Sequence, residues 1–131
     1  MYPKENNYAF IDGQNLNLGI KSLGWSLDSK KFRIYLKEKY SVTVAYYFIG
    51  YLPENQDLYS ALQKYGYYLI FKPIIADGKN KPKGNVDADL VLRVMLDYHK
   101  FDKAIIITSD GDFYCLVKYL YQNNKLKFVP S

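Results

Sequence analysis

The chain has 131 residues, of which 49% are hydrophobic and 24% are charged, close to the averages of globular domains. This composition excludes a disordered or fibrous chain, and the single cysteine, Cys115, excludes a scaffold held together by internal disulfides. Eighteen basic residues against thirteen acidic ones give a net charge of +5, which favours a polyanionic partner such as nucleic acid. Neither a signal peptide nor a membrane-spanning run is visible, so we expect a soluble, cytoplasmic, single domain over residues 1–131.

Strand-like and helix-like patterns alternate along the chain. Continuous apolar or β-branched runs predict strands, and apolar residues at helical spacing predict helices. In chain order, the expected elements are a strand over 7–11, helices within 14–23 and over 28–39, a strand over 42–49, a helix over 55–65, a strand over 67–75, a lysine-rich loop over 76–85, a helix over 86–98, a strand over 103–107, a helix over 112–123 and a strand over 126–129. The helical side chains expected to face the core are Phe32, Tyr35, Leu36, Leu58, Ala61, Leu62, Leu90, Val91, Val94, Met95, Phe113, Leu116, Val117 and Leu120.

The alternation of strands with helices predicts an α/β fold. Nearly continuous apolar strands are typical of a parallel sheet that is covered on both faces. Right-handed crossovers then favour a three-layer α/β/α sandwich around a mainly parallel, five-stranded sheet. We predict the strand order 3-2-1-4-5, because it places the first and fourth strands side by side at a topological switch point. Both strands end in aspartate turns, and ligands of open α/β sheets bind at such a point.

Aspartates gather at the carboxyl ends of these two strands. Asp12 ends the first strand, and Asp110 and Asp112 follow the fourth. Asp87 begins the helix before the fourth strand and lies on its core-facing stripe, whereas Asp89 is rotated from it by about 200°. Four converging carboxylates need a counter-charge, and ligands that are all oxygen favour Mg²⁺ or Mn²⁺.

Such a site would polarise a phosphate and activate water for phosphodiester hydrolysis. The basic loop over 79–83 would hold the substrate backbone beside it. Helix capping is the competing explanation, since an aspartate cap contributes about 1 kcal/mol. Capping accounts for one aspartate in each turn and leaves the pair Asp110 and Asp112 unexplained.

Three motifs occur together in this chain: YAFIDGQNLNLG over 8–19, KGNVDADL over 83–90 and IIITSDGDFYCLVKYL over 105–120. In their order and spacing they resemble the NYN domain, and more closely its bacterial LabA-like branch of PIN-like nucleases. The resemblance covers nearly the whole chain. It implies a PIN-like Rossmannoid sandwich and a metal-dependent ribonuclease that binds Mg²⁺ or Mn²⁺.

The resemblance also implies roles for the aspartates. Asp12 matches the metal-binding acid of the first strand, and Asp87 matches the acid of the Val-Asp motif. Asp110 and Asp112 match the paired acids of the last motif. These four residues are therefore the expected metal-binding and catalytic residues.

Three further residues are expected to contact the substrate. Asn15 matches the asparagine that follows the first acid, while Lys83 and Ser109 are candidates for binding phosphate. One position departs from the LabA-like pattern, because Arg93 stands where many members carry another acid. Asp89 is the residue that would compensate for it.

Two functions stay open at this point. The first is a Mg²⁺- or Mn²⁺-dependent endoribonuclease whose partner is RNA, expected to be single-stranded, with a homodimer as a further candidate assembly and no membrane partner. The alternative is a catalytically silent RNA- or nucleotide-binding module of the same fold, which a cation at Arg93 favours. A Toprim-type phosphoryl-transfer domain is disfavoured, because Asp12 stands where that fold would want a glutamate.

Overall fold

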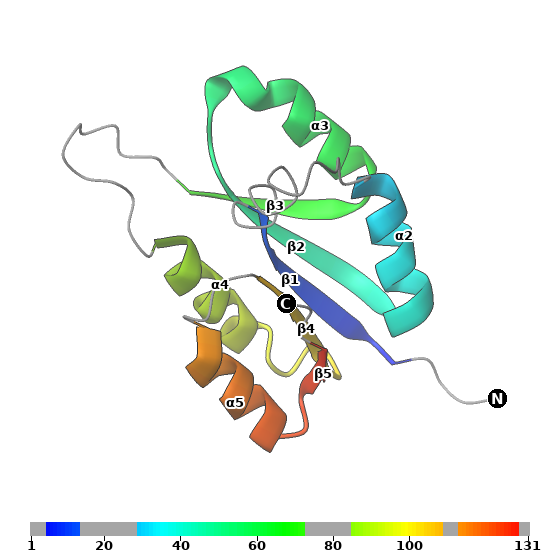
Figure 1. Cartoon of the computed structure of the whole chain (residues 1–131), viewed down its shortest axis with the longest axis vertical. Coiled ribbons are helices and arrows are strands. Elements are labelled where there is room, and N and C mark those ends of the chain that lie inside the picture. The colour runs from blue at the N-terminus through cyan, green and yellow to red at the C-terminus, as the bar shows by residue number, and fades with distance from the viewer. Residues whose placement is uncertain (1–4, 14–28, 73–84, 109–112, 129–131) are drawn as a thin grey trace.

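The computed structural model describes residues 5–13, 29–72, 85–108 and 113–128 (Figure 1). The elements within these residues are β1 (Asn7–Asp12), α2 (Ser29–Tyr40), β2 (Val42–Gly50), the 3₁₀ turn η1 (Pro53–Asn55), α3 (Gln56–Lys64), β3 (Tyr67–Lys72), α4 (Asn85–Leu96), β4 (Ala104–Ile107), α5 (Tyr114–Gln122) and β5 (Leu126–Phe128). The helix expected within 14–23 lies outside the described residues, as does most of the loop over 76–85. In the described part of the chain, no helix is both long enough and apolar enough to cross a lipid bilayer.

The five strands form one parallel sheet in the order β3-β2-β1-β4-β5, which confirms the predicted order. β1 lies at the centre, with β2 on one side and β4 on the other. The order of strands reverses between β1 and β4, so the switch point lies between their carboxyl ends. Their register places Ile11 beside Ile107, and the next residue on each strand's chain is polar: Asp12 after Ile11 and Thr108 after Ile107.

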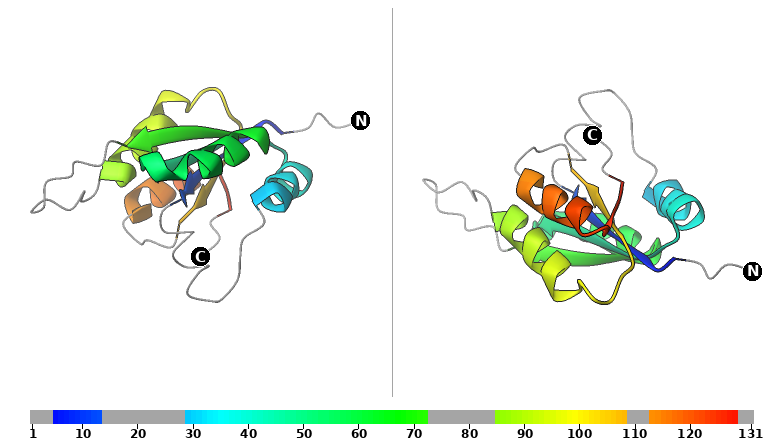
Figure 2. Two further views of the ribbon diagram at one scale, coloured as in Figure 1. Left: turned by 90° about the horizontal axis from the view of Figure 1, so that it is seen from above. Right: turned by 90° about the horizontal axis from the view of Figure 1, so that it is seen from below.

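Helices cover both faces of the sheet. Leu36 of α2 and Leu62 of α3 pack on one face, with Ala9 and Ile11 of β1. Leu90 of α4 and the α5 side chains pack on the other face, and α4 and α5 lie side by side (Figures 1 and 2). The predicted three-layer α/β/α sandwich is therefore confirmed.

Three side chains that were expected in the core are exposed instead: Tyr35, Leu58 and Met95. Each stands next to the residue that takes the core position on its helix, and these residues are Leu36, Tyr59 and Val94. One residue corresponds to about 100° of rotation, which carries the neighbouring side chain to the flank of the helix. On each helix, fewer apolar side chains are therefore buried against the sheet than the sequence pattern predicts.

Asn7 joins three elements at the amino edge of the sheet. Its side chain is fully buried, its Nδ2 donates a hydrogen bond to the carbonyl oxygen of Tyr40 at 2.6 Å, and its Oδ1 accepts one from the Lys103 N–H at 3.1 Å. Buried amides are stable only with such partners. Asn7 therefore fixes the start of β1 against the end of α2 and the segment that enters β4.

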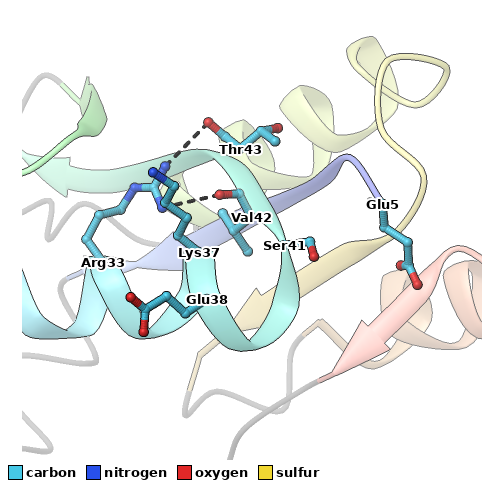
Figure 3. Close-up of a pocket in the computed structure, with 7 residues that line it drawn as sticks. All are labelled: Glu5, Arg33, Lys37, Glu38, Ser41, Val42 and Thr43. Carbon is cyan, nitrogen blue, oxygen red and sulfur yellow. Dashed lines mark hydrogen bonds between the residues drawn. The ribbon is translucent and has the colours of Figure 1, made fainter. Parts of the chain in front are cut away.

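A pocket of about 570 Å³ opens at this same amino edge (Figure 3). The residues that line it are Glu5, Arg33, Lys37, Glu38, Ser41, Val42 and Thr43. The Arg33 guanidinium donates to the carbonyl oxygens of Val42 and Thr43, at 3.3 and 3.4 Å, and burial lowers the Arg33 pKa. Arg33 thus ties α2 to the start of β2, at the edge of the sheet opposite to Asp12.

Candidate active site

Asp12 is the carboxylate that the structure places at the switch point. It is the last residue of β1, beside Phe48 of β2, and its side chain is only 2% exposed. Thr108 directly follows β4 and is also buried, and its Oγ1 donates to Asp12 Oδ2 over 3.4 Å. A buried carboxylate is costly without polar partners. The contact between Asp12 and Thr108 shows that the carboxyl ends of β1 and β4 come together as predicted.

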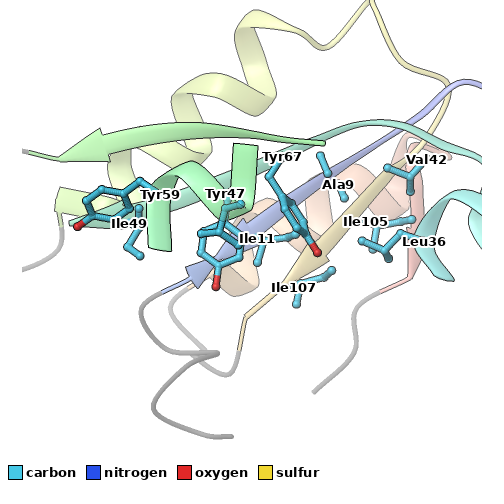
Figure 4. Close-up of a cluster of buried hydrophobic side chains, with 12 residues drawn as sticks. Ala9, Ile11, Leu36, Val42, Tyr47, Ile49, Tyr59, Tyr67, Ile105 and Ile107 are labelled. Carbon is cyan, nitrogen blue, oxygen red and sulfur yellow. The ribbon is translucent and has the colours of Figure 1, made fainter. Parts of the chain in front are cut away.

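A steric constraint explains why glycine follows Asp12. A Cβ atom added to Gly13 would lie 2.0 Å from Cε1 of Tyr47, far inside van der Waals contact. Tyr47 belongs to the apolar cluster between the sheet and the helices α2 and α3 (Figure 4). The chain leaving β1 therefore passes directly over a buried aromatic ring. Any other residue at position 13 would force the ring or the end of β1 to shift, so this close approach favours glycine.

Asp87 is placed at the same edge by the backbone. It is the third residue of α4, which packs on β1 and β2 through Leu90 and Val94. Because α4 leads into a parallel strand, its amino end lies at the carboxyl edge of the sheet. The first turn of α4 and the end of β1 thus share one edge, while the direction of the Asp87 side chain stays a prediction.

The remaining predicted site residues lie outside the described residues: Asn15, Lys83, Ser109, Asp110 and Asp112. The two residues that flank this last acidic segment are described: Thr108 directly follows β4, and Phe113 is buried in the core before α5. Among the described side chains, no group of three acidic, histidine or cysteine residues is placed to hold a metal. The convergence of four carboxylates therefore stays a prediction.

Arg93 has a partner of its own. Its guanidinium carbon lies 5.5 Å from the centre of the Tyr46 ring, a distance typical of a cation–π contact. Tyr46 in turn donates a hydrogen bond from its hydroxyl to Oδ2 of Asp97 at 2.6 Å. Burial, and then this hydrogen bond, raise the pKa of Tyr46 well above its ordinary value, so its hydroxyl stays protonated. Lys100 lies 3.5 Å from the other oxygen of Asp97.

Sequence reasoning did not identify this arrangement. Tyr46 and Asp97 are 51 positions apart, and neither belongs to a motif. The one available signal was the apolar periodicity of α4, which ends at Leu96 and leaves Asp97 at a helix terminus. Asp89, the residue proposed to compensate for Arg93, is half-buried on α4.

The comparisons with known proteins agree with this architecture. The family model of the NYN domain matches residues 8–129. The chain belongs to the NYN domain family. NYN domains have a PIN-like fold, and they are generally nucleases that act on RNA and typically use divalent metals.

One solved structure of this fold is "Crystal structure of a protein of unknown function VPA0982 from Vibrio parahaemolyticus RIMD 2210633". The similarity has a TM-score of 0.82 at 23% sequence identity and covers 98% of this chain and 83% of that chain. This likeness confirms the α/β fold of the NYN chain. No match was found among curated proteins.

Proposed function

We propose that this NYN domain is a Mg²⁺- or Mn²⁺-dependent endoribonuclease of the LabA-like branch, formed by residues 1–131 as one domain. The observation that supports it most is Asp12, a buried carboxylate at the switch point of a chain that belongs to a family of nucleases. The proposed substrate is single-stranded RNA, and the proposed compartment is the bacterial cytoplasm.

The donor set fits a hard divalent cation. Asp12 offers carboxylate oxygens at the edge where the first turn of α4 carries Asp87, and Thr108, which contacts Asp12, directly precedes the segment with Asp110 and Asp112 in the sequence. In the proposal these four aspartates hold the ion. When bound, the ion would offset the repulsion among the carboxylates and provide an activated water for attack on phosphorus.

The protein's own groups orient the reactants in this proposal. β1 places the Asp12 carboxylate at the switch point, where the Thr108 hydroxyl contacts it, so this carboxylate is positioned before substrate binds. Asn15 orients the attacking water or the scissile phosphate. Lys83 and Ser109 contact phosphate oxygens, the first through its charge and the second through its hydroxyl.

The test is cleavage of a labelled single-stranded RNA with Mn²⁺, Mg²⁺ or EDTA. We expect metal-dependent cleavage that falls at least a hundredfold in Asp12→Asn and Asp110→Asn, because each change removes a negative charge without changing the side-chain shape. Asp102→Asn is the matched control. Its carboxylate accepts the Asn6 N–H at 2.7 Å at the opposite edge of the sheet, so cleavage should persist.

The outcomes separate the candidate functions. Equal cleavage by the wild type and all three variants would contradict the proposal, because it would show that the aspartates take no part. Binding of RNA without cleavage at any metal concentration would favour the silent binding module. The cation at Arg93 is the observation on which that second candidate depends.

A further inference from the structure

An aromatic and cationic surface lies beside α4, on the sheet face toward which Asp12 points. We call it the Arg93 surface and define it by Tyr46, Tyr68 and Arg93. α4 packs chiefly on β1 and β2, and β3 extends beyond it as the edge strand of the sheet. Tyr68 of β3 is 59% exposed, although its neighbour Tyr46 is half-buried.

The strand register places this surface on the same face as Asp12. Tyr68, Tyr46 and Phe10 lie directly beside one another across β3, β2 and β1. Phe10 and Asp12 are two residues apart on β1, so their side chains point to the same face. The α4 side of the sheet therefore carries the carboxylate and the two tyrosines together.

The Arg93 guanidinium is held in place and still has donors to offer. The Tyr46 ring beneath it stacks on Phe10, with 5.6 Å between ring centres, and is anchored by its hydrogen bond to Asp97. Asp97 has Lys100 as its ion-pair partner, and Arg93 forms no ion pair with any acid of the described chain. A guanidinium carries five N–H donors in a planar fork, which matches the oxygens of a phosphate.

Tyr68 offers a flat ring beside Tyr46, the ring that Arg93 contacts. Its ring centre lies 6.1 Å from that of Tyr46, and the two rings are tilted by 46°. Exposed aromatic rings beside basic side chains are the usual elements that bind single-stranded nucleic acid, because bases stack on the rings while the cations meet the backbone. A duplex would not present its bases to such a ring.

The surface lies within reach of the candidate active site. Two strand spacings and two residues separate the Cα atoms of Tyr68 and Asp12, which amounts to about 12 Å. Arg93 follows Asp87 by six residues, about 9 Å along the axis of α4. A short single strand that lies along α4 can therefore contact both sites.

We propose that the Arg93 surface binds the RNA substrate next to the scissile bond, with Arg93 on a phosphate and Tyr68 stacked on a base. This inference rests on the proposed function, since it assigns part of the binding site for the same substrate. It gives Arg93 the role of a substrate-binding residue rather than that of a cation that replaces a metal.

The test is the affinity for a fluorescently labelled single-stranded RNA, measured by anisotropy in EDTA so that cleavage is absent. We expect Arg93→Met to weaken binding about tenfold and to reduce the slope of log K against log salt by about 0.7, because one phosphate contact is lost. We expect Tyr68→Ala to weaken binding between about fivefold and a hundredfold, and Tyr68→Phe to retain binding.

Two control variants match these changes away from the surface. Lys118→Met removes an exposed cation from α5, and Tyr121→Ala removes a ring that is 75% exposed on the same helix. Both should bind RNA as the wild type does. Thermal unfolding of every variant shows whether a loss of affinity comes from loss of the fold, and rescue by Tyr68→Phe would assign the effect to the ring.

Failure of this inference is distinguishable from failure of the proposed function. A wild type that binds and cleaves RNA, with Arg93→Met and Tyr68→Ala unchanged in affinity, would overturn the inference alone. A wild type that binds RNA and cleaves none would contradict the nuclease, and weaker binding by both variants would then still support the surface. If sedimentation shows a dimer that both variants dissociate, the surface is an interface between copies and the inference is wrong.

Discussion

The contact between Gly13 and Tyr47 makes a sharp prediction about stability. In Gly13→Ala the new methyl group would overlap Cε1 of a ring that is 2% exposed, so either the ring or the end of β1 must move. Overpacking of this kind costs about 3 kcal/mol, which corresponds to a fall in Tm of roughly 10 °C for a domain of this size. Circular dichroism during thermal and urea unfolding measures both quantities.

Gly66→Ala is the matched control for this prediction. Gly66 has φ of +103°, but a Cβ added there meets nothing closer than Arg33 Nε at 3.5 Å. Only the cost of the left-handed backbone applies, about 1 kcal/mol. In a second comparison, Tyr47→Leu should partly rescue Gly13→Ala, because it removes the ring atoms that clash. A Gly13→Ala protein as stable as Gly66→Ala, or no coupling with Tyr47→Leu, would refute the steric reasoning.

Two further changes test the buried polar groups. Asn7→Leu should lower the free energy of unfolding by about 3 kcal/mol, because it removes the two buried hydrogen bonds that Asn7 makes with the Tyr40 carbonyl oxygen and the Lys103 N–H. A loss below about 1 kcal/mol in urea unfolding would contradict this. Tyr46→Phe should cost about 2 kcal/mol at neutral pH, because Asp97 loses its hydroxyl donor. Because the pKa of Tyr46 is raised in the folded state, its contribution is complete below the pKa of a free tyrosine, near 10, and declines as the pH rises above that value. The stability gap between the wild type and Tyr46→Phe should therefore narrow in alkaline solution, and a gap that stays constant up to pH 11 would show that the hydroxyl does not titrate as expected.

The architecture was predictable because it depends on local patterns. Buried strands and amphipathic helices alternate regularly, and the aspartate turns after 7–11 and 103–107 indicated which two strands are neighbours. The meeting of Asp12 with Thr108 follows from that order. The exact stripe that each helix buries was harder to predict, because it depends on which of two adjacent apolar residues, such as Leu58 and Tyr59, fits the sheet.

The interactions of Tyr46 were beyond sequence reasoning. Its ring meets Phe10, Tyr68 and Arg93 only after three strands and one helix have taken their register, and nothing in the spacing of these residues indicates it. The candidate site could be predicted from the sequence only in part. Asp12 stands where the motif predicted, whereas the joint arrangement of the acids is still a prediction, since Asp110 and Asp112 lie outside the described residues.

The central place of β1 has a consequence for the order in which the protein can assemble. One edge of β1 pairs with β2, which follows within about thirty residues, but its other edge pairs with Ala104–Ile107 near the far end of the sequence. A nascent chain can therefore complete the half made of β1, β2 and β3 while the apolar backbone of 8–11 still has one open edge. Such an edge is a template for pairing with another chain. We expect premature termination before residue 104 to yield aggregates rather than a smaller folded domain.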